Sequence, residues 1–303
     1  MTPLPAGSEV PFYIPATGAP TRPRRTLKYG DAFAVLDAQG DIGMSAGGPD
    51  GLFFRDTRYL TRLELSISGR QPLLLGSTVL DDNVALIVDL TNPDHYQDGR
   101  LVLAKDTVHI FRSILLWNGA AYERLAVGNY GDEPAAFTIG LSFDSDFADL
   151  FEVRGQERPR RGLALPPELN GDGIVLGYRG LDQVERRTFI AFEPEPRRLD
   201  RYSAQFDLEL EPGERQALYV AIGCEEPPLK GRSGFYASLR RSRRARHRST
   251  CGVASAVASN DVFNEILCRA MADLYMLVTN TPEGPYPYAG IPWYSTTFGR
   301  DGI

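Results

Sequence analysis

From about residue 26 to residue 223, short apolar segments alternate with polar turns. Across residues 59–68, Leu60, Leu63, Leu65 and Ile67 fall mostly on one side of an extended chain. A period of two residues predicts strands that bury one face. Further strands are predicted at residues 32–37, 42–44, 84–90, 101–103, 108–116, 122–127, 136–143, 174–178, 183–192, 202–210 and 215–222. Many short strands separated by glycine, proline and aspartate, with no helix between them, predict a mainly β fold, an antiparallel β-sandwich.

The hydrophobic period changes after the last strand, and two helices are predicted there. The first covers residues 233–248. The second begins at Asn260, a good capping residue, and ends near residue 278. Its apolar residues recur at spacings of three and four, which draws one stripe along the helix: Phe263, Ile266, Leu267, Ala270, Leu274 and Leu277. Such a stripe needs a partner helix to bury it.

The charge balance narrows the class of ligand. The formal net charge is −6, which argues against nucleic acid or an anionic membrane surface as a partner and suits a neutral ligand such as a sugar. The first helix carries an arginine-rich run at residues 240–248. In an acidic chain we interpret that run as the solvated face of a linking helix.

Cysteine usage and the N-terminus indicate the compartment. Cys224, Cys251 and Cys268 show no paired spacing, which is typical of free thiols in a reducing environment. The N-terminus lacks the basic start and apolar run of a signal peptide, and no apolar run is long enough to cross a bilayer. A cytoplasmic location is therefore predicted.

No metal or organic cofactor is predicted. The three histidines, His95, His109 and His247, lie far apart and form no zinc-ligand pair. The glycine-rich residues 171–177 lie between strands and open no helix, so they predict a β-turn and not a nucleotide-binding loop.

Residues 144–152 contain four carboxylates, among them Asp146, Asp149 and Glu152. A calcium loop would need a glycine and a bidentate glutamate at fixed positions, and these are missing. The favoured interpretation is a loop at a strand end whose carboxylates accept backbone N–H bonds or pair with Arg154. A domain-interface or subsite-lining role and general acid–base work remain alternatives.

Residues 51–60 combine a flat aromatic patch with two arginines and an aspartate. An ion pair between Asp56 and Arg58 that locks a turn is the favoured interpretation. A role at a domain interface or a sugar subsite is the alternative.

Residues 286–301 have the chemistry of a sugar subsite. Five aromatic side chains lie close to an Arg-Asp pair in a loop rich in proline and glycine. Aromatic rings stack on the C–H faces of sugars, and charged groups bind paired hydroxyls. The candidate substrate-binding residues are Trp293, Tyr294, Phe298, Arg300 and Asp301.

Four segments together resemble the amylo-α-1,6-glucosidase, or glycogen-debranching, family. They occur in that family's order, and the last is the most specific: GLFFRDTRYL at 51–60, DFADLFEVRG at 146–155, NDVFNEILCRAMADLYML at 260–277 and YPYAGIPWYSTTFGRDGI at 286–303. The resemblance implies a β-sandwich that packs on an (α/α)6 catalytic barrel. It also implies hydrolysis of α-1,6-linked glucose in glycogen or limit dextrin without a cofactor, with Arg300 and Asp301 on the terminal glucose.

The resemblance and the sequence pattern together predict four parts. They are an extended, proline-rich arm at residues 1–25, a β-sandwich at 26–230, a linker helix at 231–258 and the truncated start of the barrel at 259–303. The catalytic carboxylates are expected beyond Ile303, so these 303 residues alone are predicted to be inactive.

Two other functions stay open. The chain is either a non-catalytic carbohydrate-binding or interaction module, or the start of a trehalase-like hydrolase that acts on a small glycoside.

Overall fold

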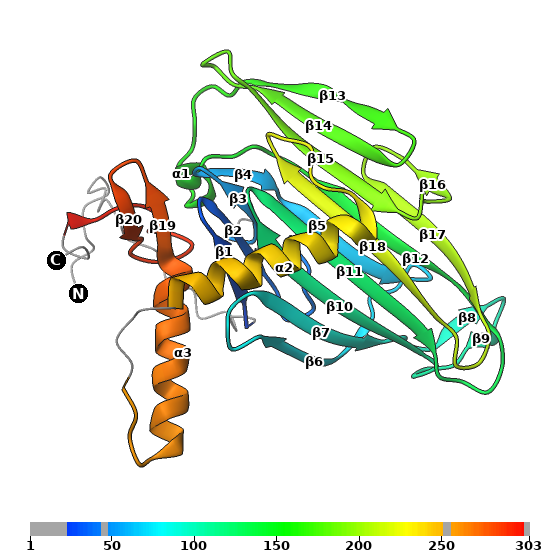
Figure 1. Ribbon diagram of the computed structural model, residues 1–303. Helices are drawn as coiled ribbons and strands as arrows, with labels where there is room; N and C mark the ends of the chain where they lie inside the picture. Colours follow the sequence, from blue (N-terminus) through cyan, green and yellow to red (C-terminus); the bar gives the residue numbers. More distant parts are fainter. Residues whose placement is uncertain (1–22, 44–47, 251–255, 300–303) are drawn as a thin grey trace, which may run out of the picture.

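The structure is a computed structural model that describes residues 23–43, 48–250 and 256–299. Antiparallel strands dominate up to Cys224, and helices follow, so the predicted mainly β fold is confirmed (Figure 1). The strands are β1 (Arg25–Tyr29), β2 (Ala32–Leu36), β3 (Gly51–Phe54), β4 (Thr57–Leu60), β5 (Arg62–Ile67), β6 (Leu73–Val79), β7 (Ala85–Thr91), β8 (His95–Gln97), β9 (Arg100–Leu103), β10 (Val108–Trp117), β11 (Ala120–Asn129), β12 (Ala135–Asp144), β13 (Leu163–Asn170), β14 (Gly173–Arg179), β15 (Glu185–Glu193), β16 (Arg198–Leu199), β17 (Ser203–Leu210), β18 (Arg215–Cys224), β19 (Val278–Thr281) and β20 (Gly284–Pro287). The helices are α1 (Leu150–Val153), α2 (Gly231–Thr250) and α3 (Asp261–Leu277).

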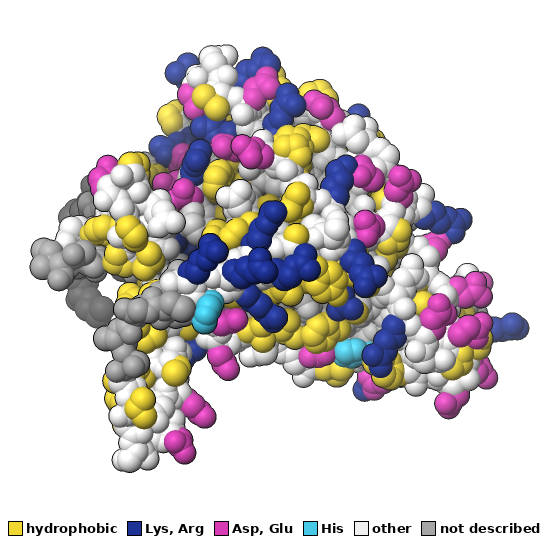
Figure 2. Space-filling model, viewed as in Figure 1, with side chains coloured by type: hydrophobic (Ala, Val, Ile, Leu, Met, Phe, Trp, Pro, Cys, Tyr) yellow, Lys and Arg dark blue, Asp and Glu magenta, His cyan; other side chains and the backbone are white. Residues whose placement is uncertain are grey.

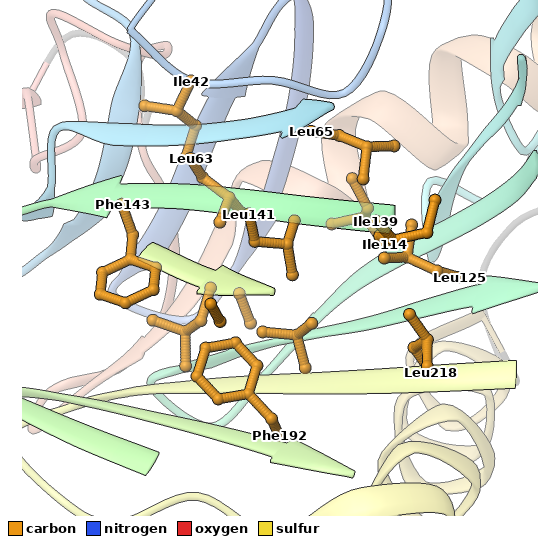
Figure 3. Close-up of a cluster of buried hydrophobic side chains, with 14 of the residues drawn as sticks. Ile42, Leu63, Leu65, Ile114, Leu125, Ile139, Leu141, Phe143, Phe192 and Leu218 are labelled. Carbon is orange, nitrogen blue, oxygen red and sulfur yellow. The ribbon is translucent and has the colours of Figure 1, made fainter. Parts of the chain in front are cut away.

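One large sheet faces two smaller ones. The eight-stranded sheet has the order β13-β14-β15-β18-β11-β10-β7-β6, and the two four-stranded sheets have the orders β1-β2-β3-β4 and β16-β17-β12-β5. Strand β4 leads through Thr61 into β5, which joins the smaller sheets into one layer. The main core lies between this layer and the large sheet (Figure 3).

Alternation of buried and more exposed positions is clear where one face meets the core. In β12 and β17 every second side chain is buried, as the period of two predicts. Strands β10 and β11 instead bury residues on both faces. The physical reason is a second cluster on the outer face, where Phe235 of α2 packs against Leu115, Tyr122 and Tyr219. Figure 1 shows α2 lying across β10, β11 and β18.

The arginines of α2 form a basic patch on the face turned away from the sheet (Figure 2). The exposed arginines of α2 are Arg232, Arg240, Arg241, Arg243, Arg244 and Arg248. The run at residues 240–248 agrees with the solvated face that the sequence predicts. Arg246 differs, because it is half-buried and its guanidinium donates to the carbonyl oxygens of Asp82 and Ala272. That side chain ties α2 to α3.

A buried ion triad crosses the core. Arg112 of β10 is fully buried and donates to Asp41 at 2.6 Å and to Glu123 of β11 at 2.7 Å. Its remaining donors reach the carbonyl oxygens of Gln39 and Gly40. Burial raises the pKa of Asp41 to about 6 in spite of the opposing effect of Arg112. The triad fixes the turn at residues 37–41 against the middle of the large sheet.

Several predicted strands differ in their limits, and others were missed. Residues 59–68 form two strands, because the chain passes from one small sheet to the other at Thr61. Of residues 42–44, Ile42 makes only an isolated bridge to Leu63, and Met44 lies outside the described residues. The apolar pattern did not predict the two edge strands of the large sheet, β6 and β13. It also did not predict β1, β3, β8, β16, β19 and β20. Strand β13 contains Pro166 and Pro167. Proline has no backbone N–H, and it is tolerated there because the outer side of an edge strand has no neighbouring strand to which it must donate.

Helix α3 is formed as predicted, and Asn260 caps it by accepting from the backbone N–H of Phe263. None of its residues is buried. Its ties to the rest of the chain lie toward its C-terminal end, where Asp273 accepts from Asn83 and Arg269 donates to the carbonyl oxygen of Leu80. The described part of the chain contains no helix that is both long and apolar enough to cross a bilayer.

The first prediction concerns the triad. Arg112→Met should lower the free energy of unfolding, measured by urea denaturation, by about 3–5 kcal/mol, because two carboxyl groups remain buried without their cation. Arg62→Ala is the matched control. Arg62 forms a more exposed ion pair with Glu64 on β5, so its loss should cost less than about 1 kcal/mol.

If the cost at Arg112 comes from the uncompensated charge, replacing Asp41, Arg112 and Glu123 together with leucine or methionine should restore most of the lost stability. A triple variant that is no more stable than Arg112→Met would show that shape, and not charge, decides this part of the core.

The second prediction concerns α3. Its amide protons should exchange faster with solvent than those of β10 and β11, because its apolar stripe has little cover and an isolated helix of this length is marginal in water. The contacts of Arg269 and Asp273 place the greater protection in its C-terminal half. Hydrogen exchange read by mass spectrometry measures both; α2, which packs on the sheet, is the control. Protection of all of α3 equal to that of the β core would contradict the expectation.

Candidate functional site

Two of the segments singled out in the sequence join through their backbones. The turn between β3 and β4 places Arg55 and Asp56 at φ 46° and 61°, the pair of positive φ angles of a tight hairpin. Beside that turn, the N–H of Leu150 donates to the carbonyl oxygen of Asp56, and the N–H of Arg58 donates to that of Ala148, each at 2.9 Å. The acidic loop therefore extends the edge of the small sheet.

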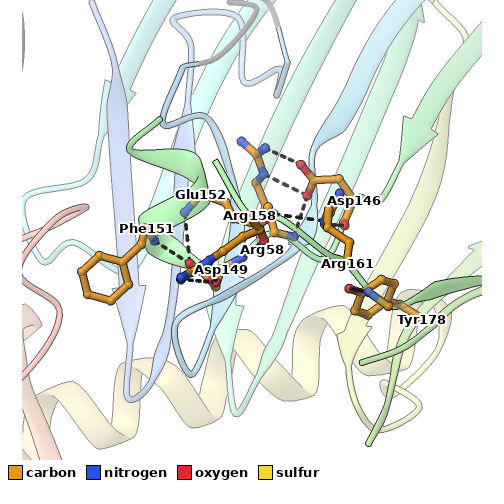
Figure 4. A network of polar contacts seen from close by, with 10 residues as sticks. Arg58, Asp146, Asp149, Phe151, Glu152, Arg158, Arg161 and Tyr178 are labelled. Atoms are coloured by element: carbon orange, nitrogen blue, oxygen red, sulfur yellow. Dashed lines mark hydrogen bonds and ion pairs between the residues drawn. The ribbon is translucent and has the colours of Figure 1, made fainter. Parts of the chain in front are cut away.

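Arg58 does not pair with Asp56, so that predicted ion pair is wrong. Its guanidinium instead forms a two-pronged pair with Asp146 and also donates to the carbonyl oxygens of Gly48 and Asp50 (Figure 4). The reason is geometric: Arg58 lies on β4, and the acidic loop runs beside that strand. The pair joins the two segments across 88 residues of sequence.

Asp149 and Glu152 order the short helix α1. Asp149 accepts from the N–H groups of Phe151 and Glu152, and Glu152 accepts in return from the N–H of Asp149. This reciprocal arrangement satisfies the first free N–H groups of the helix and confirms that the carboxylates accept backbone N–H bonds. The arginines that pair with them are Arg158 and Arg161, so the predicted pairing with Arg154 is wrong.

Arg154 instead contacts residues 286–299, which we call the aromatic segment. It donates to the carbonyl oxygen of Trp293, and its guanidinium lies 5.4 Å and 5.5 Å from the ring centres of Trp293 and Tyr294. The ring of Phe151 lies 5.7 Å from the same guanidinium. Arginine stacks on aromatic faces because its charge is attracted to their electron-rich surfaces. We call this contact between α1 and the aromatic segment the junction.

Apolar packing also holds the aromatic segment at the junction. Trp293 and Ile291 pack against a cluster that includes the stacked rings of Phe33 and Phe53, whose centres lie 4.5 Å apart. Phe298 lies farther along the segment and meets Tyr294 edge to face at 5.8 Å. Of the predicted sugar-binding residues, Trp293, Tyr294 and Phe298 thus adjoin one another. Arg300 and Asp301 lie outside the described residues.

Two residues of the site, Asp31 and Lys28, were missed in the sequence. Asp31 accepts from the hydroxyl of Tyr288 at 3.2 Å. Lys28 is 5% exposed, lies 4.9 Å from the ring centre of Tyr288 and donates to Thr279 and to the carbonyl oxygen of Leu277. Burial lowers the pKa of Lys28 to about 8. The one available signal was the position of Lys28 between Leu27 and Tyr29, and its partners lie about 250 residues away.

The carboxylates of the junction differ in their freedom to act. Asp146, Asp149 and Glu152 are held by arginines. Asp31 and Asp56 form no ion pair within the described residues. Partial burial, followed by the nearby charge of Asp31, raises the pKa of Asp56 above its ordinary value, and Arg154 opposes the rise. These two carboxylates can accept hydrogen bonds from a hydroxylated ligand.

No metal centre is formed by the part of the chain that the structure describes, since no three histidine, cysteine, aspartate or glutamate side chains converge there. The contacts of the junction are instead rings, a guanidinium and carboxylates. Such groups bind neutral polyhydroxy compounds.

The chain is thus an antiparallel β-sandwich that carries rings, a guanidinium and carboxylates at one edge. Residues 27–221 match the family model described as the N-terminal domain of some glycogen debranching enzymes. This match covers well over half of the sequence, and the chain belongs to that family. The suspected resemblance is thereby confirmed, and the chain is part of a family of glycan-acting enzymes. No curated protein matches the sequence significantly.

The solved structures that match this chain are distant in sequence. A putative kojibiose phosphorylase from the human microbiome is 9% identical, with a TM-score of 0.43; the match covers 84% of this chain and 36% of that one. A putative aldose 1-epimerase from Escherichia coli K12 is 10% identical, with a TM-score of 0.38 and coverages of 67% and 99%. A galactose mutarotase related enzyme from Lactobacillus acidophilus is 11% identical, with a TM-score of 0.39 and coverages of 67% and 97%. The chain thus spans about a third of the phosphorylase.

The third prediction tests the junction. Arg154→Ala should weaken the docking of the aromatic segment by about 2 kcal/mol, since it removes a charged hydrogen bond and the stacking on two rings. Trp117 and Trp293 are the two tryptophans of the chain, so in a Trp117→Phe background the emission of Trp293 reports the change. Emission should shift to longer wavelength as the indole meets water.

Arg158→Ala is the matched control, because Arg158 pairs with Asp149 of the same helix but does not touch the aromatic segment. An equal shift in both variants would assign the effect to α1 as a whole and not to the contact of Arg154.

Proposed function

We propose that the chain is the N-terminal part of a glycoside hydrolase that acts on α-glucans in the cytoplasm. The proposed reaction is the hydrolysis of α-1,6-linked glucose at the branch points of glycogen or limit dextrin. Family membership supports the class of enzyme. The linkage and the substrate rest on the resemblance of residues 51–60, 146–155 and 286–303 to amylo-α-1,6-glucosidases.

The observation that carries the proposal is the contact of Arg154 with Trp293 and Tyr294. Through it the sandwich holds the segment whose rings can stack on a sugar. An aromatic loop alone would lose many conformations on binding, and each ordered side chain has an entropic cost. A loop held in advance by a packed arginine avoids part of that cost. In this proposal the sandwich positions one wall of the sugar subsite.

Arg300 and Asp301 complete the proposed subsite. They follow Phe298 by two and three residues in the sequence, and in this proposal they supply the charged groups of the subsite. A charged hydrogen bond to a sugar hydroxyl contributes about 1.5–3 kcal/mol. The simpler role for Asp301 is a helix cap, which contributes about 1 kcal/mol to stability.

The fourth prediction separates the two roles of Asp301 in the protein encoded by the complete reading frame. Asp301→Asn keeps the size and the capping ability of the side chain but removes its charge. If Asp301 binds the terminal glucose, kcat/KM for glucose release from limit dextrin should fall about tenfold to a hundredfold, with little change in Tm. Steady-state kinetics and a thermal melt measure the two quantities.

Near-normal kinetics with a fall of several degrees in Tm would make Asp301 a cap. The 303-residue chain is the control for background hydrolysis and should release no glucose, because a proton donor and a second carboxylate must face each other across the scissile bond. Glucose release by this chain, above a heat-killed sample, would overturn the expected position of the catalytic pair.

A further inference from the structure

A cleft of about 760 Å³ opens beside the junction and is not part of it. Its walls come from the β1–β2 turn, the β10–β11 turn and the residues after β18. The C-terminal half of α2 and the C-terminal end of α3 complete them. Figure 1 shows α2, α3 and β1 converging there. The cleft meets the junction at Asp31, which lines the cleft and also accepts from Tyr288. Its volume is in the range of sites that enclose a small ligand.

Aromatic rings form part of the lining of the cleft. Tyr29 and Trp117 meet with ring centres 4.4 Å apart, and each is half-buried, so part of each ring stays open. Tyr29 packs on the main core, while Trp117 packs on the cluster beneath α2. The rings are therefore fixed by two cores. Phe54, Tyr122 and Tyr275 add further aromatic surface to the walls.

Charged side chains of both signs line the cleft in equal number. The basic residues are Lys28, Arg55, Arg241 and Arg246, and the acidic residues are Asp31, Asp82, Glu225 and Glu226. A site for an anion would carry an excess of positive charge. A lining of balanced charge with aromatic rings suits a neutral ligand with many hydroxyl groups, which donate to carboxylates and accept from guanidinium groups.

Among the charged residues of the cleft, Arg241 is the best placed to donate hydrogen bonds to a ligand. It is exposed on α2 and forms no ion pair within the described residues, and it lines the cleft. Arg55, by contrast, lies 3.7 Å from Glu225, which also accepts from Tyr59. Arg246 is held by the carbonyl oxygens of Asp82 and Ala272.

We propose that this cleft is a second carbohydrate-binding site, in which a short neutral α-glucan stacks on Tyr29 and Trp117 and hydrogen-bonds to Arg241. The choice of an α-glucan rests on the proposed function. The stacking surface and the balance of charges are features of the cleft itself. The site anchors a chain of the glycan beside the proposed sugar subsite at the junction. A second anchor raises the effective concentration of a branched polymer.

The two tryptophans make the proposal testable, because one lies in each site. In a Trp293→Phe variant of the 303-residue chain, the emission of Trp117 reports the cleft, and in a Trp117→Phe variant Trp293 reports the junction. Titration with maltohexaose should produce a saturable change in the emission of Trp117. No saturable change in a folded Trp293→Phe protein would overturn the proposal.

Arg241→Ala in the Trp293→Phe background should raise the Kd read from Trp117 about tenfold, because a charged hydrogen bond to the sugar is lost. Arg243→Ala is the matched control: it removes the same charge from the same exposed helix, but Arg243 does not line the cleft. An equal rise in both variants would show a non-specific effect of charge and overturn the assignment.

Two more outcomes separate this proposal from the proposed function. Saturable binding at Trp293 but not at Trp117 would refute the cleft and support the junction as the sugar subsite. Binding at Trp117 with an inactive complete protein would support the cleft and refute the hydrolase. Inorganic phosphate is the anionic probe, and a saturable response of Trp117 to phosphate would overturn the neutral class of ligand.

Discussion

Strands β10, β11 and β18 are covered on one face by the layer of small sheets and on the other by α2. Double cover explains why the middle of the large sheet is apolar on both faces and why Arg112 must bring its own counter-charges into the core. It also fixes where the chain leaves the sandwich. Phe235 packs α2 onto the outer face, and Arg246 near the other end of that helix donates to Ala272 of α3. Helix α3 in turn contacts β1.

The carboxylates of the acidic loop, residues 144–152, hold local structure in place through ion pairs and a helix cap. Three of its carboxylates pair with Arg58, Arg158 and Arg161, and two of them also cap α1. Among the described residues Arg154 has no carboxylate partner, and it contacts the rings of the aromatic segment instead. The loop thus acts through Arg154. A residue that orients a binding segment affects affinity without touching the ligand, and changes there resemble losses of stability as much as losses of function.

Two aromatic surfaces lie close to each other along one edge of the sandwich, the junction around Trp293 and the cleft around Trp117. They share Asp31 but rest on different supports: α1 and the stacked phenylalanines under the first, and two cores under the second. A glycan is long compared with either site. Two modest sites at a fixed spacing retain such a polymer better than one, provided that the chain can reach both.

The sequence by itself determined the class of fold, most of the strands, both long helices and the family, because periodicity, capping residues and short motifs are local properties. Strands β6 and β13 escaped, since edge strands bury little and need no regular alternation. Partners were decided by the tertiary structure alone. Arg58 pairs with Asp146 and not with Asp56, and Lys28 donates to Thr279. These partners are 88 and 251 residues apart in the sequence, and the fold brings them together. Sequence distance carries no trace of such contacts when the charges that meet are common ones.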